Sequence, residues 1–108
     1  MIEIIAIIRP NKTSATKQAL IDVGLPGYTC IKAFGRGKKP VDISLPDGTT
    51  ISTKLMNKRV FLIVVPNESK EEVIKTILKV NSTGLPGDGK IFTINISDTY
   101  NIHHACHD

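Results

Sequence analysis

The chain has 108 residues, a length that suits one domain and leaves no room for a second. Hydrophobic residues make up 41% and charged residues 22%, which is ordinary for a globular domain and excludes a disordered chain. No apolar run approaches the roughly 18 residues that a membrane span needs, and the first residues lack the basic region of a signal peptide. We therefore expect a single cytoplasmic domain, residues 1–108, without membrane insertion.

The charge balance is mildly basic, with 14 Lys and Arg residues against 10 acidic ones and a net charge of +4. With two Tyr, three Phe and no Trp, the chain lacks the aromatic platform that single-stranded nucleic acid requires. We expect a small anionic ligand or an acidic partner, and no direct nucleic-acid binding. Two cysteines without a signal peptide indicate reduced thiols.

The first half of the chain predicts a strand, a helix and a second strand. Residues 1–9 are rich in Ile and indicate a strand buried on at least one face. Pro10 ends this strand, because proline cannot donate to a ladder. Asn11 or Thr13 is expected to cap the helix that follows, and Gly24 to end it at a positive φ. A second strand is expected over residues 28–34.

The stretch from Gly35 to about Met56 holds few large apolar residues, which is unusual for so long a segment in a small domain. One interpretation is a long β-hairpin that turns around residues 45–48; the other is a mobile functional loop. We favour a loop with hairpin strands at its base. We expect residues 38–53 to be poorly ordered, because the segment offers too little apolar surface to offset the entropy of ordering.

The second half predicts a strand over residues 60–65, a helix with a stripe of Val73, Ile77 and Val80, and a strand over residues 91–96. Asn67 or Ser69 is expected to cap the helix. The order β-α-β-loop-β-α-β predicts an α+β, ferredoxin-like sandwich with both helices on one face. The letters Gly-Leu-Pro-Gly follow each helix, at residues 24–27 and 84–87, as two related halves require.

Two segments combine glycines with cations. Residues 83–90 read Thr-Gly-Leu-Pro-Gly-Asp-Gly-Lys, in which the glycines allow backbone N–H groups to surround an anion and Lys90 adds charge. The helix-loop-strand order is not that of a Walker A loop, and on spacing alone a helix C-cap followed by a tight turn is the favoured interpretation. Residues 34–39 read Phe-Gly-Arg-Gly-Lys-Lys, either a phosphate clamp or a solvated basic loop.

These segments resemble the P-II nitrogen-regulatory signalling proteins, and the resemblance covers residues 1 to about 100. It rests on Ala-Ile-Ile-Arg-Pro at 6–10, Gly-Leu-Pro-Gly-Tyr-Thr at 24–29, Phe-Gly-Arg-Gly at 34–37, and Thr-Gly-x-x-Gly-Asp-Gly-Lys-Ile-Phe at 83–92. The resemblance implies a homotrimeric sensor rather than an enzyme. It implies ATP or ADP in the clefts between subunits, often with Mg²⁺ and 2-oxoglutarate. It also implies a T-loop, about residues 37–56, that docks on an ammonium transporter, nitrogenase or another nitrogen-metabolism protein.

By residue match, the resemblance also implies the site. Lys58 would meet the carboxylate of 2-oxoglutarate. The nucleotide-binding positions would be Thr29, Gly35, Arg36, Gly37, Val64, Thr83, Gly87, Asp88, Gly89 and Lys90.

The chain departs from the family pattern at several positions. The T-loop region has no Tyr and so lacks the uridylylation site of enteric relatives, while Gly37 replaces a Gln that helps to hold Mg²⁺ and 2-oxoglutarate. Asn101 and His103 stand where two phosphate-facing Arg residues are usual, which predicts weaker nucleotide binding unless protonated His103 compensates. The Phe-Gly-Arg-Gly-Lys run and the Tyr-free loop resemble the nitrogenase-associated branch of the family.

The last segment, residues 97–108, is atypical and holds all three His residues. His103, His104, Cys106 and His107 are residue types that bind Zn²⁺, Ni²⁺ or Cu. The alternatives are a polar tail without a ligand, or a nucleotide-facing role for His103. A second function therefore stays open: a diverged P-II-like protein that senses a metal ion or another small anion through this tail. No nucleophile, base and orienting group occur at informative spacing, so we expect no enzymatic activity.

Overall fold

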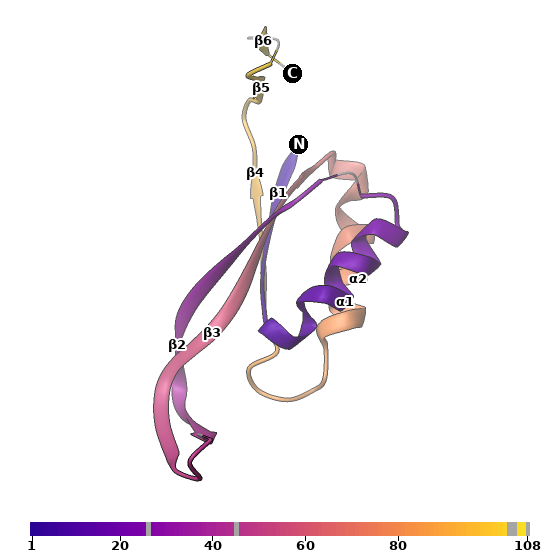
Figure 1. Cartoon of the computed structure of the whole chain (residues 1–108). Coiled ribbons are helices and arrows are strands. Elements are labelled where there is room, and N and C mark those ends of the chain that lie inside the picture. Colours follow the sequence, from indigo (N-terminus) through magenta and orange to yellow (C-terminus); the bar gives the residue numbers. More distant parts are fainter. Residues whose placement is uncertain (26, 45, 104–105, 108) are drawn as a thin grey trace.

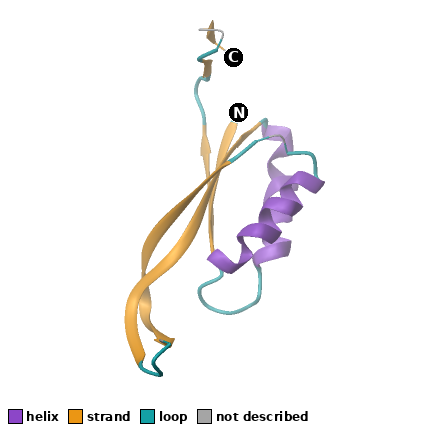
Figure 2. Cartoon of the chain, in the orientation of Figure 1, coloured by secondary structure: helices purple, strands orange, loops and turns teal. Residues whose placement is uncertain are grey.

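The computed structural model describes residues 1–25, 27–44, 46–103 and 106–107. In chain order the elements are β1 (Ile2–Ile8), η1 (Pro10–Lys12), α1 (Thr13–Asp22), β2 (Thr29–Ser44), β3 (Thr50–Val65), η2 (Asn67–Ser69), α2 (Lys70–Asn81), β4 (Gly89–Asn95), β5 (Tyr100–Asn101) and β6 (Cys106–His107). The main strands and helices follow the β-α-β-β-α-β order, and both α-helices cover one face of the sheet (Figures 1 and 2). The expected ferredoxin-like fold is confirmed.

The sheet is antiparallel, with the strand order β2-β3-β1-β4. Strand β1 alternates strictly, so every second side chain, from Ile2 to Ile8, is buried against the helices. Its partner β3 places Phe61, Ile63 and Val65 on the same side, because residues directly opposite in a ladder share a face. The Ile-rich opening therefore forms the centre of the core.

The helices add Leu20 from α1 and Val73 and Ile77 from α2 to this core. They are joined by a buried polar contact, in which the Asn81 Nδ2 atom donates to the Thr16 hydroxyl at 3.0 Å. Gly24 has a φ of +80° just after α1, which confirms its expected role as a helix stop.

The expected side-chain caps were wrong: neither α-helix has a side-chain hydrogen bond at its N-cap. A 3-10 turn precedes each helix instead. Its backbone supplies an early hydrogen bond, from Lys12 N to Arg9 O at 3.1 Å and from Ser69 N to Pro66 O at 3.0 Å. Ser69 occupies the N-cap of α2 but does not use its hydroxyl there. Pro10 is the first residue of η1 and Pro66 directly precedes η2, so a proline with its fixed φ begins each of these turns.

Strands β2 and β3 are 16 residues each and continue well beyond the other strands (Figure 1). Their pairing runs to Ser44 opposite Thr50, so the favoured loop with strands only at its base was wrong and the long hairpin is correct. The backbone register places residue 43 of β2 opposite residue 51 of β3, so the two strands stay paired close to the turn. At the tip, the Asp47 carboxylate accepts hydrogen bonds from the backbone and hydroxyl of Thr49.

The face of the sheet away from the helices is apolar over several strands. Ile31, Val64, Phe92 and Ile94 are each 43–50% exposed there. They share this side by register with β1 residues such as Ile5. We call this surface the open face. An apolar surface that spans a whole sheet is a common feature of subunit interfaces.

The chain leaves the domain at the end of β4. The short strands β5 and β6 then pair with each other as a separate two-stranded sheet (Figure 1). None of the helices in the described part of the chain is long and apolar enough to cross a membrane.

Candidate functional site

The Gly-rich loop between α2 and β4 is folded around the Asp88 carboxylate. Asp88 accepts hydrogen bonds from the Thr83 hydroxyl at 2.5 Å, from Thr83 N at 2.8 Å and from Gly84 N at 3.2 Å. The Thr83 hydroxyl and backbone therefore lower the pKa of Asp88, and the nearby Arg9 charge lowers it further. Asp88, predicted to contact the nucleotide, thus uses its carboxylate to hold the two ends of its own loop together.

Two cations, one that directly follows β1 and one from β3, meet at this loop. Arg9, just after β1, donates from Nη2 to Pro86 O at 2.7 Å and from Nε to Gly87 O at 3.0 Å, and its Nη2 lies 3.5 Å from the Asp88 carboxylate. Lys58 of β3 donates to the same Gly87 O at 3.1 Å. We call Arg9, Lys58 and the loop carbonyls of Pro86 and Gly87 the cation cluster.

The electrostatics of the cation cluster favour an anion. The pKa of Lys58 is lowered, first by burial and then by repulsion from the Arg9 guanidinium, while Asp88 partly offsets both. An added negative charge would relieve that repulsion. Arg9 was missed by sequence reasoning, although one signal was present: it is the single cation in the Ile-rich opening, placed where the strand ends at Pro10.

Two glycines hold the loop close to β1. Gly89 has a φ of +120°, and a Cβ atom there would lie 1.8 Å from the carbonyl oxygen of Ile7, so no other residue fits without movement of the backbone. Gly87 has a φ of +92°, and its Cβ would lie 3.2 Å from Arg9 Nη2. The spacing of glycines in the motif therefore has a structural cause beyond any ligand.

The structure brings together the two Gly-and-cation segments that the sequence singled out. A Cβ at Gly35 would lie 3.7 Å from the Lys58 side chain, whose ammonium reaches Gly87. Met56, the ladder partner of Gly35, extends its methyl group to 3.9 Å from a Cβ at Gly87. The base of the hairpin and the Gly-rich loop are thus neighbours in one protomer.

The other predicted residues divide between the two sides of the sheet. Thr29, Lys58, Val64 and Lys90 lie on the open face, since their ladder partners do. Arg36 follows Gly35 on β2 and pairs with Leu55, so its side chain leaves the sheet on the other side. Gly37 belongs to β2 where the pairing with β3 becomes irregular. Within one protomer, Arg36 and Lys90 therefore do not share a face.

The described residues of the tail lie far from this loop. His103 follows β5, beyond the end of β4 opposite to the Gly-rich loop (Figure 1), and Asn101 is part of β5. His104 lies outside the described residues, as do the side chains of Cys106 and His107. Among the described residues, no group of three or more potential metal ligands is present. A role of His103 beside phosphates would therefore need the loop of another copy.

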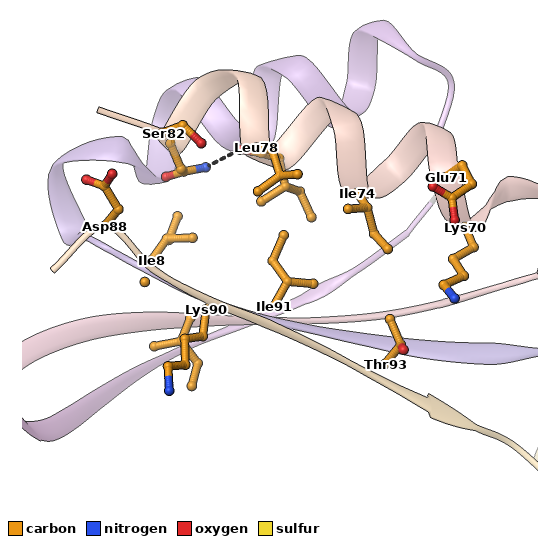
Figure 3. Close-up of a pocket in the computed structure, with 14 residues that line it drawn as sticks. Ile8, Lys70, Glu71, Ile74, Leu78, Ser82, Asp88, Lys90, Ile91 and Thr93 are labelled. Carbon is orange, nitrogen blue, oxygen red and sulfur yellow. Dashed lines mark hydrogen bonds between the residues drawn. The ribbon is translucent and has the colours of Figure 1, made fainter. Parts of the chain in front are cut away.

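A cavity of about 560 Å³ lies on the helix side of β4 (Figure 3). Ile74 and Leu78 of α2 form one wall and face Ile8 and Ile91 of the sheet. The Lys90 ammonium points away from α2, below the sheet. Asp88 also lines this groove, so the groove borders the cation cluster through the Asp88–Arg9 ion pair.

A ferredoxin-like domain with a long β2–β3 hairpin, whose base adjoins a Gly-rich loop held by two cations, defines the class of protein. The family model named nitrogen regulatory protein P-II matches residues 1–105, and the chain belongs to this family. P-II proteins are regulatory signalling proteins of nitrogen metabolism rather than enzymes.

Individual relatives agree with this assignment. The nitrogen fixation nifHD region GlnB-like protein 2 of Methanobacterium ivanovii is 39% identical, over 94% of this chain and 91% of that protein. The protein with the same description from Methanococcus maripaludis is 37% identical, over 91% of this chain and 88% of that protein. The nitrogen regulatory protein P-II of Pyropia yezoensis is 36% identical, over 89% and 86%.

Proposed function

We propose that this P-II protein responds to adenine nucleotide, ATP or ADP, bound in clefts between the subunits of a homotrimer, and is itself not an enzyme. The observation that carries the proposal is the adjacency of the hairpin base at Gly35 and the Gly-rich loop at Gly87, joined by Lys58. Glycine-rich backbone beside cations suits a polyphosphate. In this proposal the open face carries Thr29, Val64 and Lys90 to the nucleotide.

The cation cluster is the proposed position for a second anion. Arg9 and Lys58 converge on one carbonyl oxygen, and burial and mutual repulsion lower the pKa of Lys58. A carboxylate of 2-oxoglutarate would replace that carbonyl as the partner of both cations. Gly37 offers no side chain to Mg²⁺, so we propose that 2-oxoglutarate depends on these cations more than on a shared metal ion.

The proposed output is regulation of a nitrogen-metabolism protein by the β2–β3 hairpin. The nifHD-region descriptions of the relatives favour nitrogenase or a protein that acts on it over an ammonium transporter. The hairpin base adjoins the cation cluster, so a ligand there can bias the position of the whole hairpin. Hairpin and nucleotide site would then form one switch.

Calorimetry on tag-free protein tests the nucleotide proposal. We expect binding of ATP and ADP, and Arg36→Ala and Lys90→Ala should each weaken it by about 1.5–3 kcal/mol if each side chain makes a charged hydrogen bond to phosphate. Because Arg36 and Lys90 lie on opposite sides of one sheet, both effects together imply a site shared between copies. Lys75→Ala, on the exposed side of α2, is the matched control and should leave the affinity unchanged.

Two other results would contradict the proposal in different ways. If the protein bound Zn²⁺ but neither nucleotide, the tail-sensing alternative would replace the proposed function. If Arg36→Ala and Lys90→Ala both folded and bound ATP as the native chain does, the assigned site would be wrong even though nucleotide binds elsewhere.

A further inference from the structure

A second surface of the hairpin base is strongly basic and carries an exposed aromatic ring. On the helix-facing side of the sheet, the residues beyond the buried Phe61 are Lys32, Phe34, Asn57 and Arg59. We call these four residues the basic ribbon face. Phe34 is 79% exposed, the most exposed of the three Phe residues.

The charges of the basic ribbon face are arranged unfavourably for the isolated protein. Lys32 and Arg59 are direct ladder partners, and like charges placed opposite each other in a sheet destabilise it. Arg36, two positions beyond Phe34, extends the same side, and no acidic residue occurs among the ladder positions there. The neighbouring η1, which contacts β3, carries a further cation in Lys12.

The side chains are also available to a partner. Lys32 is exposed, and Arg59 is held in place by a hydrogen bond from Nη1 to the carbonyl oxygen of Lys58 at 3.2 Å. A guanidinium has five N–H donors, and this bond uses one. Phe34 sits between these cations and Arg36, and an apolar side chain of the partner could cover its ring.

We infer that the basic ribbon face docks an acidic segment of a partner protein, in which carboxylates flank an apolar side chain. The inference rests on the proposed function for the premise that the hairpin docks on a protein. A partner engaged by the hairpin would pass along its base, where the two cations of the basic ribbon face provide charge complementarity. A nucleic acid fits less well, because one exposed ring provides no stacking series.

A labelled peptide tests this inference directly. The probe is a fluorescein-tagged synthetic peptide with Glu residues on both sides of one Phe, and the measurement is fluorescence anisotropy at two salt concentrations. We expect the double variant Lys32→Gln/Arg59→Gln to bind it about tenfold more weakly, since two charged contacts are lost. The matched control is Lys75→Gln/Lys79→Gln on the exposed side of α2, which removes the same net charge and should change binding less than about twofold.

Three outcomes would overturn the inference. The first is no binding of the peptide to the native chain, and the second is an equal loss in the α2 control. The third is displacement of the peptide by duplex DNA with the same dependence on Lys32 and Arg59, which would make the face a site for nucleic acid. ATP calorimetry on the same variants keeps the two proposals apart, because the acidic-segment inference can stand when nucleotide binding fails, and the reverse also holds.

A stability measurement gives a second readout. If Lys32 and Arg59 are kept opposite each other for a partner, Lys32→Gln should raise the melting temperature at low salt, and the gain should shrink as salt screens the repulsion. A lower melting temperature at both salt concentrations would show that the pair supports the fold, and would contradict its assignment to binding.

Discussion

Single residues explain why the Gly-rich loop has its sequence. Asp88 ties the start of the loop to its end through Thr83, while Gly89 brings the chain against the Ile7 carbonyl where no side chain fits. Arg9 then covers the loop from β1. Much of the motif is therefore needed to fold the loop, before any ligand is considered.

Gly89→Ala should be strongly destabilising, by about 3 kcal/mol or more, because a positive φ and a clash with backbone add together. The control is Gly27→Ala, where nothing lies within 4 Å of the new Cβ, and we expect a change within about 0.5 kcal/mol. Urea unfolding followed by circular dichroism measures both. Equal stabilities would mean that the approach of Gly89 to β1 is absent in solution.

The acid stability of the loop should depend on Asp88. Its pKa is lowered in the folded protein by the Thr83 hydrogen bonds, so its ionised form stabilises the fold above the unfolded-state pKa of about 3.9. This contribution disappears as the pH falls from about 5 through the lowered pKa. Asp88→Asn should flatten the decline in unfolding free energy below about pH 5, and Glu68→Gln, at an exposed position of η2, serves as the control. If the unfolding free energy of Asp88→Asn fell as steeply with pH as that of the native chain, other carboxyl groups would be the cause of the acid sensitivity.

At the scale of the elements, the hairpin differs from the rest of the sheet. Strand β1 pairs with β3 only as far as Arg59, so no third strand of the described residues pairs with the outer part of β2 and β3. A lone two-stranded ribbon is only marginally stable in water. The hairpin therefore has paired strands but low local stability.

Hydrogen exchange should show this difference. Amides of residues 38–44 and 50–53 should exchange orders of magnitude faster than those of residues 60–65, which lie in the centre of the sheet. Mass spectrometry of peptides from the ligand-free protein measures both regions. Equal protection would indicate a rigid hairpin, and the proposed switch would then lose its moving part.

The sequence predicted the elements better than their ends. The Ile-rich opening and the β-branched run at 60–65 were confirmed as the buried strands, because burial alone fixes such patterns. The extent of the hairpin was missed, since its pairing depends on register between Ile43 and Ile51 across a turn and not on local hydrophobicity. Asn11 was misread as a cap, and Ser69 stands at the N-cap of α2 without a side-chain hydrogen bond, because a 3-10 turn supplies backbone hydrogen bonds before each helix.

The site was also predicted only in part, because local motifs do not show which distant segments meet after folding. Glycine spacing located the loop at 84–89, but the cation that covers it, Arg9, lies 78 residues away from Gly87 and is visible only after folding. The different faces of Arg36 and Lys90 depend on strand alternation and could not be seen from their motifs.

At the scale of the whole molecule, the open face predicts self-assembly, and the trimeric state of P-II family proteins gives the expected number of copies. Exposed Phe92 and Ile94 of β4 and Ile31 of β2 lie on one side of the sheet, and this much apolar surface is costly to leave in water. In light scattering coupled to size exclusion, we expect three times the mass of one chain at micromolar concentration.

A matched pair of variants tests which face assembles. Ile94→Glu should produce smaller species, because it places a charge in the apolar interface. Leu78→Glu changes a residue of similar exposure, 48% against 50%, on α2 and should leave the mass unchanged. A native chain that runs as a monomer would contradict the predicted assembly. A trimer that persists in Ile94→Glu but not in Leu78→Glu would show that the interface lies on the helix side.

The irregular pairing within the hairpin gives it a mechanical property. Between the pairs Arg36–Leu55 and Val41–Thr53, residues 37–40 of β2 lie opposite one residue of β3, and such an irregularity bends the strand and raises its local twist. At about 3.3 Å per residue, the hairpin tip lies about 15 Å beyond this irregularity and about 30 Å beyond Arg59. Gly35 and Lys58, at the base of the ribbon, adjoin the Gly-rich loop. A rotation of about 10° at Arg59 would carry the tip about 5 Å, so in the proposed switch a small rearrangement around Lys58 would displace the tip by a distance that a partner can detect.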